Sequence, residues 1–365
     1  MARSRRLGVE AALVRGELLV GDVEVADGRI AAVGLESGNG RGIAAPGFVD
    51  LQVNGFAGID FFSADGDSYR RAGEALLRTG VTAFQPTFIS SPEEELTAAL
   101  HELPQNGPAP HVLGAHLEGP FLALERLGTH PVSARRDPDP DLLERLLAAG
   151  RVTHVTLAPE LPGALELIDL LRARGITVSC GHSNATAEEA HEAFAHGART
   201  VTHLFNAMRP FAAREPGLAG AALASAEVSV QVILDGVHLA DDTARLVWQT
   251  AAGRVALVTD AVAGAGLGDG SYRLASVDVE ITGGVARRGS TLAGSTVPMI
   301  EAVRNLVALG APVAAALAAA SEVPARIAGR DDVGTLQPGA DADVVVLNDR
   351  LEVERVLAAG EDVLG

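Results

Sequence analysis

The chain has 365 residues, 47% of them hydrophobic and only 4% aromatic, so a sizeable core must be built mostly from alanine, valine, leucine and isoleucine. Its net charge of −18 argues against nucleic acid or an anionic membrane as a partner. All 29 strongly basic residues are arginine. The lack of lysine excludes Schiff-base chemistry, a metal pair bridged by a carboxylated lysine, and a Walker-type phosphate loop.

The cellular setting predicted from the sequence is the cytoplasm. No run of 18 apolar residues is present, and the basic first residues lack the apolar stretch of a signal peptide. Cys180 is the only cysteine, which excludes an internal disulfide and a cysteine-based metal site. We expect Cys180 to be a buried apolar filler rather than a nucleophile, because no histidine is placed as an obvious base for it.

Both ends of the chain are predicted to form short strands. Residues 1–45 alternate weakly, with turns expected at Gly21–Asp22 and Asp27–Gly28. Residues 331–365 show the same pattern, with 344–347 as the clearest strand. Two β-rich ends flanking a long middle suggest one small sheet domain, although two unrelated tails are an alternative on pattern alone.

The middle, residues 46–330, alternates strands with helical stretches such as 141–149 and 187–196. The expected strands are 48–53, 81–85, 112–117, 154–158, 176–180, 200–204, 228–234 and 255–259. Eight strand–helix units predict an α/β fold of the (β/α)8 TIM-barrel type. Polar residues fall at or just after the strand ends, where barrel enzymes place their sites: Gln52, Asn54, Glu118, His182, His203, Asp235, His238 and Asp260.

Glu118, His182 and His203 are the predicted metal ligands. Each alone has a structural explanation, such as a hydrogen-bonded histidine or a loop-capping carboxylate. Together, two imidazoles and one carboxylate at one barrel mouth form a catalytic zinc set with room for a water molecule, whose pKa the metal lowers towards 7. Asp260 ends an apolar strand and is the predicted general base, with a helix N-cap as the alternative.

Further residues are candidates for substrate contacts. Arg214 is the best candidate for a phosphate partner, because guanidinium binds phosphate in a bidentate fork; a surface ion pair with Glu215 is the alternative. The small turn TLAGS offers backbone N–H groups to a ligand. The complete set of predicted substrate-binding residues is Thr129, His130, Asn206, Ala207, Arg214, Asp235, His238, Leu292, Ala293 and Gly294.

These motifs in this order resemble the N-acetylglucosamine-6-phosphate deacetylases of the amidohydrolase superfamily. The resemblance runs from Pro46 to Ser295 through PGFVDLQVNG, HLEGPF, GTH, GHS, THLFNAM, REPGLAG, DGVH, TDA and LAGS, and the closing GTLQPGADADVVVLN resembles the superfamily's terminal sheet domain. It implies a small β-sandwich domain made from residues 1–45 and 331–365, around a catalytic barrel of residues 46–330.

The resemblance also assigns roles. It implies that Glu118, His182 and His203 bind the metal, that Asp260 is the catalytic acid/base, and that the residues above bind substrate. Gln52 and Asn54 stand where the superfamily has a His-x-His pair for a second metal, and amides are poor ligands in place of imidazole. The expected cofactor is therefore one divalent ion per subunit, with zinc first and iron(II), cobalt(II) and manganese(II) as alternatives.

The function implied is hydrolysis of N-acetyl-D-glucosamine 6-phosphate to D-glucosamine 6-phosphate and acetate, in amino-sugar catabolism. A metal-bound water is the expected nucleophile, and Asp260 is the expected general base and then acid. The partner is a small amino-sugar phosphate, and a homodimer is expected, with Arg214 reaching across its interface. N-acetylgalactosamine 6-phosphate is an alternative substrate, a sugar-phosphate-binding regulator without catalysis is an alternative class, and the division of roles between His130 and His238 stays open.

Overall fold

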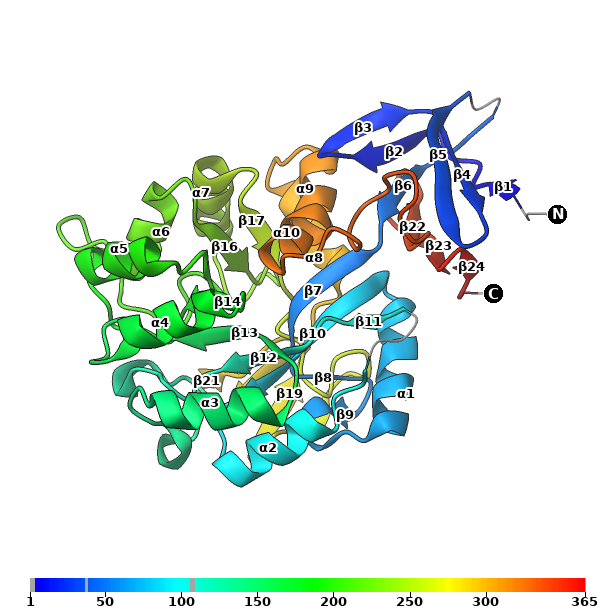
Figure 1. Cartoon of the computed structure of the whole chain (residues 1–365). Coiled ribbons are helices and arrows are strands. Elements are labelled where there is room, and N and C mark those ends of the chain that lie inside the picture. The colour runs from blue at the N-terminus through cyan, green and yellow to red at the C-terminus, as the bar shows by residue number, and fades with distance from the viewer. Residues whose placement is uncertain (1–3, 37–38, 106–108, 365) are drawn as a thin grey trace.

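A parallel β-barrel lies at the centre of the computed structural model of this chain (Figure 1). The structure describes residues 4–36, 39–105 and 109–364. Residues 1–3, 37–38 and 365 of the predicted end domain, and 106–108 of the predicted barrel, lie outside the described residues.

Eight parallel strands form the barrel within the described part of the chain, and each pairs with the next. They are β7 (Phe48–Val53), β10 (Val81–Ile89), β12 (Ala115–Glu118), β13 (Val152–Leu157), β14 (Thr177–Cys180), β15 (Thr200–Val201), β16 (Ser229–Val232) and β17 (Val255–Leu257). A parallel bridge from Val53 to Ala261, just after β17, brings the last strand back to the first. The predicted TIM barrel is confirmed.

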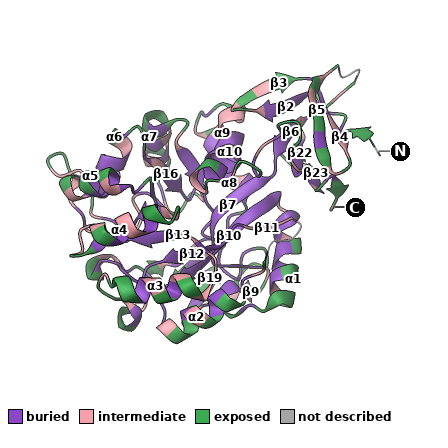
Figure 2. Cartoon of the chain, in the orientation of Figure 1, coloured by how far each residue is buried: buried purple, intermediate pink, exposed green. Residues whose placement is uncertain are grey.

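Burial explains why these strands carry long apolar runs. Every residue of β7 and of β10 is buried, as expected for parallel strands covered on both faces (Figure 2). The predicted strand 112–117 is interrupted, and β11 (His111–Val112) is separate from β12. The break falls at Gly114, whose φ of +106° and close approach to Thr153 and Arg151 leave no room for a side chain.

Helices surround the barrel on the outside (Figure 1). They are α1 (Gly66–Leu77), α2 (Glu93–His101), α3 (Pro140–Ala149), α4 (Ala164–Ala173), α5 (Ala187–His196), α6 (Gly217–Ala224), α7 (Asp241–Ala251), α8 (Met299–Ala308), α9 (Val313–Ala320) and α10 (Glu322–Ile327), with short 3-10 turns η1 (Phe61–Ser63), η2 (Leu124–Arg126) and η3 (Val132–Ala134). Asp139 caps α3 through the N–H of Leu142, and Thr186 and Glu189 form a reciprocal capping box on α5. Among the helices described, none is long and apolar enough to cross a membrane.

Strands from the two chain ends pair, as the sequence suggested. A six-stranded sheet has the order β24-β23-β22-β6-β2-β3, and a three-stranded sheet has the order β1-β4-β5. Their bounds are β1 (Ser4–Arg6), β2 (Ala11–Val14), β3 (Glu17–Val20), β4 (Asp22–Ala26), β5 (Arg29–Leu35), β6 (Ile43–Pro46), β22 (Val344–Leu347), β23 (Val353–Ala358) and β24 (Glu361–Asp362). One apolar cluster, including Val23, Ile30, Val344 and Leu357, joins residues of both ends. The alternative of two unrelated tails is therefore wrong, while the domain limits at 45 and 331 stay a prediction.

An inserted sheet follows the last barrel strand, and the sequence reading did not anticipate it. Its antiparallel strands are β18 (Gly270–Leu274), β19 (Val277–Thr282), β20 (Val285–Arg288) and β21 (Thr291–Leu292). A two-stranded ribbon, β8 (Gly55–Phe56) with β9 (Ile59–Asp60), follows β7. The inserted sheet has its own apolar cluster, which includes Ile89 at the end of β10, so this cluster ties the sheet to the barrel.

Candidate active site

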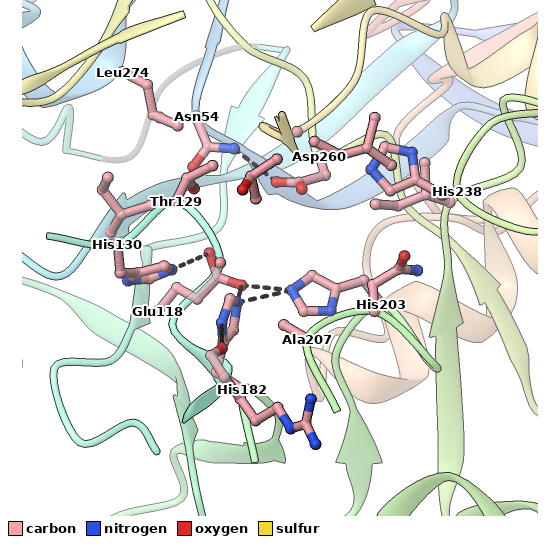
Figure 3. A pocket seen from close by; sticks show the side chains of 18 of the residues that line it. Asn54, Glu118, Thr129, His130, His182, His203, Ala207, His238, Asp260 and Leu274 are labelled. Carbon is pink, nitrogen blue, oxygen red and sulfur yellow. Dashed lines mark hydrogen bonds and ion pairs between the residues drawn. The ribbon is translucent and has the colours of Figure 1, made fainter. Parts of the chain in front are cut away.

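The predicted metal ligands come from the carboxyl ends of three barrel strands, β12, β14 and β15, and meet at one pocket (Figure 3). Glu118 is the last residue of β12, while His182 and His203 each lie two residues beyond β14 and β15. Glu118 Oε1 lies 3.2 Å from His182 Nε2 and 2.9 Å from His203 Nε2, and the two Nε2 atoms are 3.1 Å apart. All three side chains are at most 6% exposed.

This geometry fits a bound cation. Tetrahedral ligands about 2.1 Å from a metal ion lie about 3.4 Å from one another, close to the three separations observed. His182 Nδ1 donates a hydrogen bond of 2.8 Å to the carbonyl oxygen of Arg126. In the neutral imidazole, Nε2 then carries a lone pair that faces the carboxylate of Glu118 and the ring of His203, an arrangement that a cation between them would stabilise.

His130 also lies beside Glu118, but its ring is used differently. Glu118, His130 and His182 offer donor atoms within 4.8 Å of one another. His130 Nδ1 accepts the N–H of Ser90 at 3.2 Å, so in the neutral ring the hydrogen is on Nε2, which points to Glu118 Oε2 at 3.4 Å. Burial, followed by the charge of His182, lowers the pKa of His130 to about 4, so the ring is neutral at pH 7. A neutral N–H donor does not ligate a metal, which favours His203 as the third ligand.

Several of these residues adopt a left-handed backbone that side chains other than glycine rarely take. The φ angles are +48° at His182, +29° at His203, +50° at Ala207 and +50° at Asp260. Such conformations cost about 1–3 kcal/mol each and gather at functional sites. Their presence at the two imidazoles and at Asp260 is independent support for a functional role of this pocket.

Asp260 lies three residues beyond β17 and faces the donor cluster. Its Oδ1 accepts a hydrogen bond of 2.7 Å from the amide of Asn54. Burial, followed by the negative charge of Glu118, raises the pKa of Asp260 to about 7, while His203 and Asn54 act in the opposite direction. Gly294 packs so closely on Asp260 that a Cβ would lie 2.5 Å from its carbonyl oxygen, so glycine is required there.

Comparison with known proteins indicates the family to which this chain belongs. The amidohydrolase family model matches residues 43–363. The human N-acetylglucosamine-6-phosphate deacetylase is 41% identical over 88% of this chain and 83% of its own length. The N-acetylgalactosamine-6-phosphate deacetylase of Escherichia coli O157:H7 is 36% identical over 98% of both chains.

This chain belongs to the amidohydrolase family. Among solved structures, a variant of the N-acetyl-D-glucosamine-6-phosphate deacetylase of Mycobacterium smegmatis, in complex with N-acetyl-D-glucosamine-6-phosphate, superimposes with a TM-score of 0.92 at 36% identity, covering 99% of both chains. The corresponding enzyme of Thermotoga maritima gives 0.89 at 32% identity, covering 98% of this chain and 99% of its own. The predicted family and hydrolase class are confirmed.

In this amidohydrolase, Gln52 and Asn54 turn their amide groups towards carboxylates. Gln52 Nε2 donates to Glu118 Oε1 at 3.0 Å, as Asn54 does to Asp260. The carbonyl oxygens of both amides are buried without a hydrogen-bond partner among the described residues. Gln52 therefore orients Glu118, and Asn54 orients Asp260, while the absence of a second metal stays a prediction.

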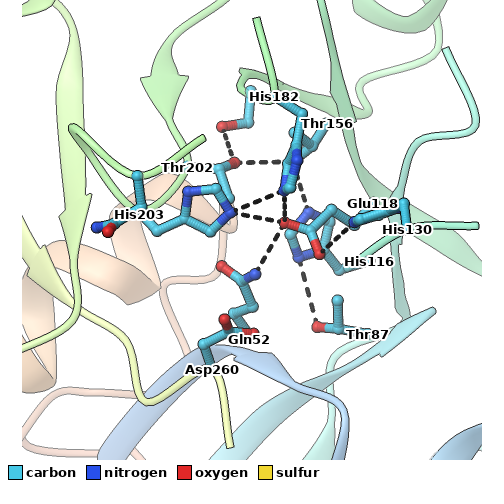
Figure 4. Close-up of polar contacts among 12 residues, drawn as sticks. Gln52, Thr87, His116, Glu118, His130, Thr156, His182, Thr202, His203 and Asp260 are labelled. Atoms are coloured by element: carbon cyan, nitrogen blue, oxygen red, sulfur yellow. Dashed lines mark hydrogen bonds and ion pairs between the residues drawn. The ribbon is translucent and has the colours of Figure 1, made fainter. Parts of the chain in front are cut away.

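A polar layer that the sequence reading missed lies beneath the amidohydrolase site (Figure 4). His116 Nε2 is 2.7 Å from Thr156 Oγ1, which is 2.7 Å from Thr202 Oγ1. The ring of His116 also stacks on that of His154 at 4.0 Å between centroids. Burial lowers the pKa of His116 to about 4, so it is a neutral hydrogen-bonding residue. The layer connects β12, β13 and Thr202, the residue before His203. It therefore stabilises the strand ends that carry the ligands.

The pocket encloses about 290 Å³ above this layer, and most predicted substrate residues line it. These are Thr129, His130, Asn206, Ala207, His238, Leu292 and Gly294. Asp235 is not among the lining residues; its Oδ2 accepts from Nδ1 of His238 at 2.7 Å and so orients that ring. Ala293 is buried behind the surface.

Arg214 lies outside the pocket lining and is exposed. Within the described chain it makes no hydrogen bond or ion pair, and Glu215 instead accepts the backbone N–H groups of Ala187 and Gly217. The predicted alternative, an ion pair between Arg214 and Glu215, is therefore wrong. The arginine that does line the pocket is Arg126, half-buried and donating to Asn184 at 3.1 and 3.2 Å.

The sequence reading also missed several lining residues, namely Ile89, Glu125, Arg126, Ile233, Leu274 and Thr291. Ile233 was predicted only as part of the strand 228–234, and Ile89 lies beyond the predicted strand 81–85, because β10 runs on to residue 89. Leu274 and Thr291 belong to the unexpected inserted sheet. The alternating burial of β19 offered a signal for that sheet, since VDVEIT alternates apolar and polar residues.

Proposed function

We propose that this amidohydrolase hydrolyses the N-acetyl group of N-acetyl-D-glucosamine 6-phosphate, giving D-glucosamine 6-phosphate and acetate, in cytoplasmic amino-sugar catabolism. The observation that carries the proposal is the convergence of Glu118, His182 and His203 on one point opposite Asp260. The M. smegmatis relative, whose fold matches over 99% of this chain, was solved with that sugar phosphate bound.

Glu118, His182 and His203 would hold one divalent metal ion, with zinc as the first candidate. When bound there, such an ion supplies a Lewis acid and lowers the pKa of a water molecule towards neutrality. Gln52 and Asn54 support a single-metal site, because their amides already bond to Glu118 and Asp260 and are poor ligands for a second ion.

Asp260 would move the proton. A carboxylate whose pKa is about 7 is ionised in a large fraction of molecules at neutral pH, so it takes a proton from the attacking water. Once protonated, it delivers the same proton to the nitrogen as the C–N bond breaks. Without that proton the amine would be a very poor leaving group. Asn54 keeps the carboxylate directed through its bond to Oδ1.

His130 and His238 would contact the substrate. His130 presents a neutral Nε2–H donor, and its separation of 3.4 Å from Glu118 Oε2 is long for a hydrogen bond, so the N–H can turn to the amide carbonyl and polarise it. His238 is held at Nδ1 by Asp235, which leaves Nε2 for a sugar or phosphate oxygen. We therefore assign the carbonyl to His130 and the sugar phosphate to His238.

Arg214 would bind the phosphate across a homodimer interface. It is exposed and unpaired within the described residues, and it lies outside the pocket of its own chain. Phe211, three residues earlier, is 56% exposed and offers an apolar contact for a second copy. A phosphate on the partner's substrate would supply the anion that Arg214 lacks within its own chain.

Acetate release from N-acetyl amino sugars, with and without 6-phosphate, tests the proposal alongside metal analysis of the purified protein. We expect rapid release from N-acetyl-D-glucosamine 6-phosphate, slow release from the unphosphorylated sugar, and about one metal ion per subunit. Because the E. coli relative is named for the galactosamine epimer, that sugar phosphate is the second candidate substrate and belongs in the same panel. Tight sugar-phosphate binding without acetate release would overturn the proposal in favour of a regulator.

A further inference from the structure

The inserted sheet contributes an apolar wall to the pocket. Leu274, the last residue of β18, lines the pocket and is only 4% exposed. It belongs to one apolar cluster with Ile89, Val262 and Ala293. The side chain of Leu274 is therefore fixed from behind by packing, and the face it shows to the pocket has a set position.

This wall begins next to the metal-donor cluster. Ile89, the last residue of β10, pairs directly with Glu118 in the parallel register and is 3% exposed. Figure 3 shows Leu274 beside Asn54, whose amide bonds to Asp260. Ile89 and Leu274 thus line the pocket on the side of Glu118 and Asn54, next to the space between the donor cluster and Asp260.

The opposite side of the pocket is polar. Figure 3 shows His203, Ala207 and His238 across the pocket from Leu274, and Asn206 lines the same pocket. Sugar hydroxyls and a phosphate lose several kcal/mol if they are buried without hydrogen-bond partners, so we place the sugar on the side of His203 and His238. The carbonyl carbon carries the sugar nitrogen on one side and the acyl chain on the other. The acyl chain is then directed to the apolar side.

We propose that Leu274 and Ile89 form the acyl-binding wall and limit the substrate to short acyl groups, an inference that rests on the proposed deacetylation. The chemical class of substrate is a 6-phosphorylated amino sugar with a one- or two-carbon N-acyl group. The methyl group of an acetyl substituent packs on the two side chains. A third or fourth carbon would collide with Leu274.

Hydrogen bonds fix the inserted sheet to the barrel at two places, so the wall keeps its position when a longer acyl chain enters the pocket. Arg288 of β20 donates a hydrogen bond of 2.8 Å to the carbonyl oxygen of Thr129, across the pocket rim. On the other side, the N–H of Ser295, next to Gly294, donates to the carbonyl oxygen of Asp260 at 2.8 Å. The inserted sheet is therefore held to the loop of His130 and to the general base.

Leu274→Ala tests the proposal with glucosamine 6-phosphate acylated by formyl, acetyl, propanoyl or butanoyl groups. Release of the free amine is measured, so that one assay serves all four. We expect the ratio of kcat/KM for butanoyl to kcat/KM for acetyl to rise about 10- to 100-fold, as expected for an added or removed methylene or two in an apolar pocket. Leu274→Phe should have the opposite effect and lower the ratio of kcat/KM for acetyl to kcat/KM for formyl by about 10-fold.

Leu267→Ala is the matched control, because Leu267 lies between β17 and β18 but is 58% exposed and does not line the pocket. Its acyl-length profile should equal that of the parent. Calorimetric affinities of the butanoyl substrate, compared between Asp260→Asn and Asp260→Asn/Leu274→Ala, give a second readout free of turnover. We expect the double variant to bind it about 10-fold more tightly.

Parallel acyl-length profiles for the parent, Leu274→Ala and Leu274→Phe would overturn the wall while leaving deacetylation intact. The same holds if Ile233→Ala, at an apolar lining position outside the wall, produces the change instead. Failure of the parent to release amine from the acetyl substrate would overturn the proposed function itself, and the wall with it.

Discussion

The two sides of the pocket treat a buried carboxylate in opposite ways. Burial opposes the ionisation of Glu118. With no cation between the side chains, positive charge on His182 and the N–H groups of the surrounding imidazoles hold the pKa of Glu118 well below the usual range, and a bound cation would do the same once those imidazoles are neutral ligands. Asp260 is also buried, but burial and the nearby negative charge of Glu118 outweigh its partners His203 and Asn54, and its pKa rises to about 7. The same residue chemistry therefore gives a permanent anion on one side and a proton carrier on the other, and the neighbours decide which.

Removing the permanent anion should have the largest effect. Glu118→Gln replaces the charged donor by a neutral amide and leaves two imidazoles to hold the ion. We expect metal content to fall well below one ion per subunit, and turnover to fall about 10⁴-fold, because both the Lewis acid and the activated water are lost. Atomic emission and amine release measure the two.

Glu125→Gln is the control for this change, since Glu125 lines the same pocket but is exposed. It should keep both metal and activity. Full metal content with normal turnover in Glu118→Gln would show that the cluster of Glu118, His182 and His203 does not hold the ion.

Changing the proton carrier should affect chemistry without affecting the ion. Asp260→Asn keeps the shape and the neighbour Asn54, but it can neither take nor return a proton. We expect kcat to fall about 10³-fold, within the range typical of lost general acid–base catalysis, while metal content and substrate affinity stay near those of the parent. Near-normal turnover in this variant would remove Asp260 from the mechanism and with it the contrast with Glu118.

The sequence predicts the principal residues of both sides but not the contacts that orient them. Glu118, His182, His203 and Asp260 were predicted, because each follows an apolar strand and parallel strand ends converge in a barrel. The hydrogen bonds that orient these side chains were not predicted. His182 is oriented by a backbone carbonyl, which no side-chain motif records.

The unpredicted parts have common physical causes. The layer of His116, Thr156 and Thr202 depends on side chains from three strands meeting inside the barrel, so it follows from register rather than from local pattern. Leu274 belongs to an insertion after the eighth strand, at a point where the alternating strand–helix rule gives no guidance. Arg214 is exposed, as a surface ion pair would require, but Glu215 is held by the backbone N–H groups of Ala187 and Gly217, which the local sequence does not indicate.

Arg214 offers a smaller test, at a distance from both carboxylates. Arg214→Ala removes a charge-assisted hydrogen bond to phosphate, so we expect KM for the phosphorylated sugar to rise about 10- to 100-fold. KM for the unphosphorylated sugar should change little. Arg245→Ala is the control, because that half-buried arginine pairs with Asp242 on α7. Equal changes for both sugars would argue against a phosphate role.

The smallest expected effect concerns the pKa of Asp260. Asn54 donates to the ionised carboxylate at 2.7 Å and so lowers its pKa, although burial and Glu118 raise it more. Asn54→Leu removes that bond, and the pKa should rise further. Since the ionised base is the active form, kcat/KM is lost as pH falls through this pKa, and the acid limb of the profile should move to higher pH.

The comparison must be made between variants, because a bound cation lowers the midpoint of every profile by its own charge. At pH 6 we expect Asn54→Leu to be several-fold slower than the parent, with the two converging above pH 8. Thr291→Ala, in the same pocket but without a bond to Asp260, should leave the limb in place. An acid limb that stays fixed in Asn54→Leu would show that the limb reports the titration of a group other than Asp260. The proton carrier of the pocket would then have to be another residue.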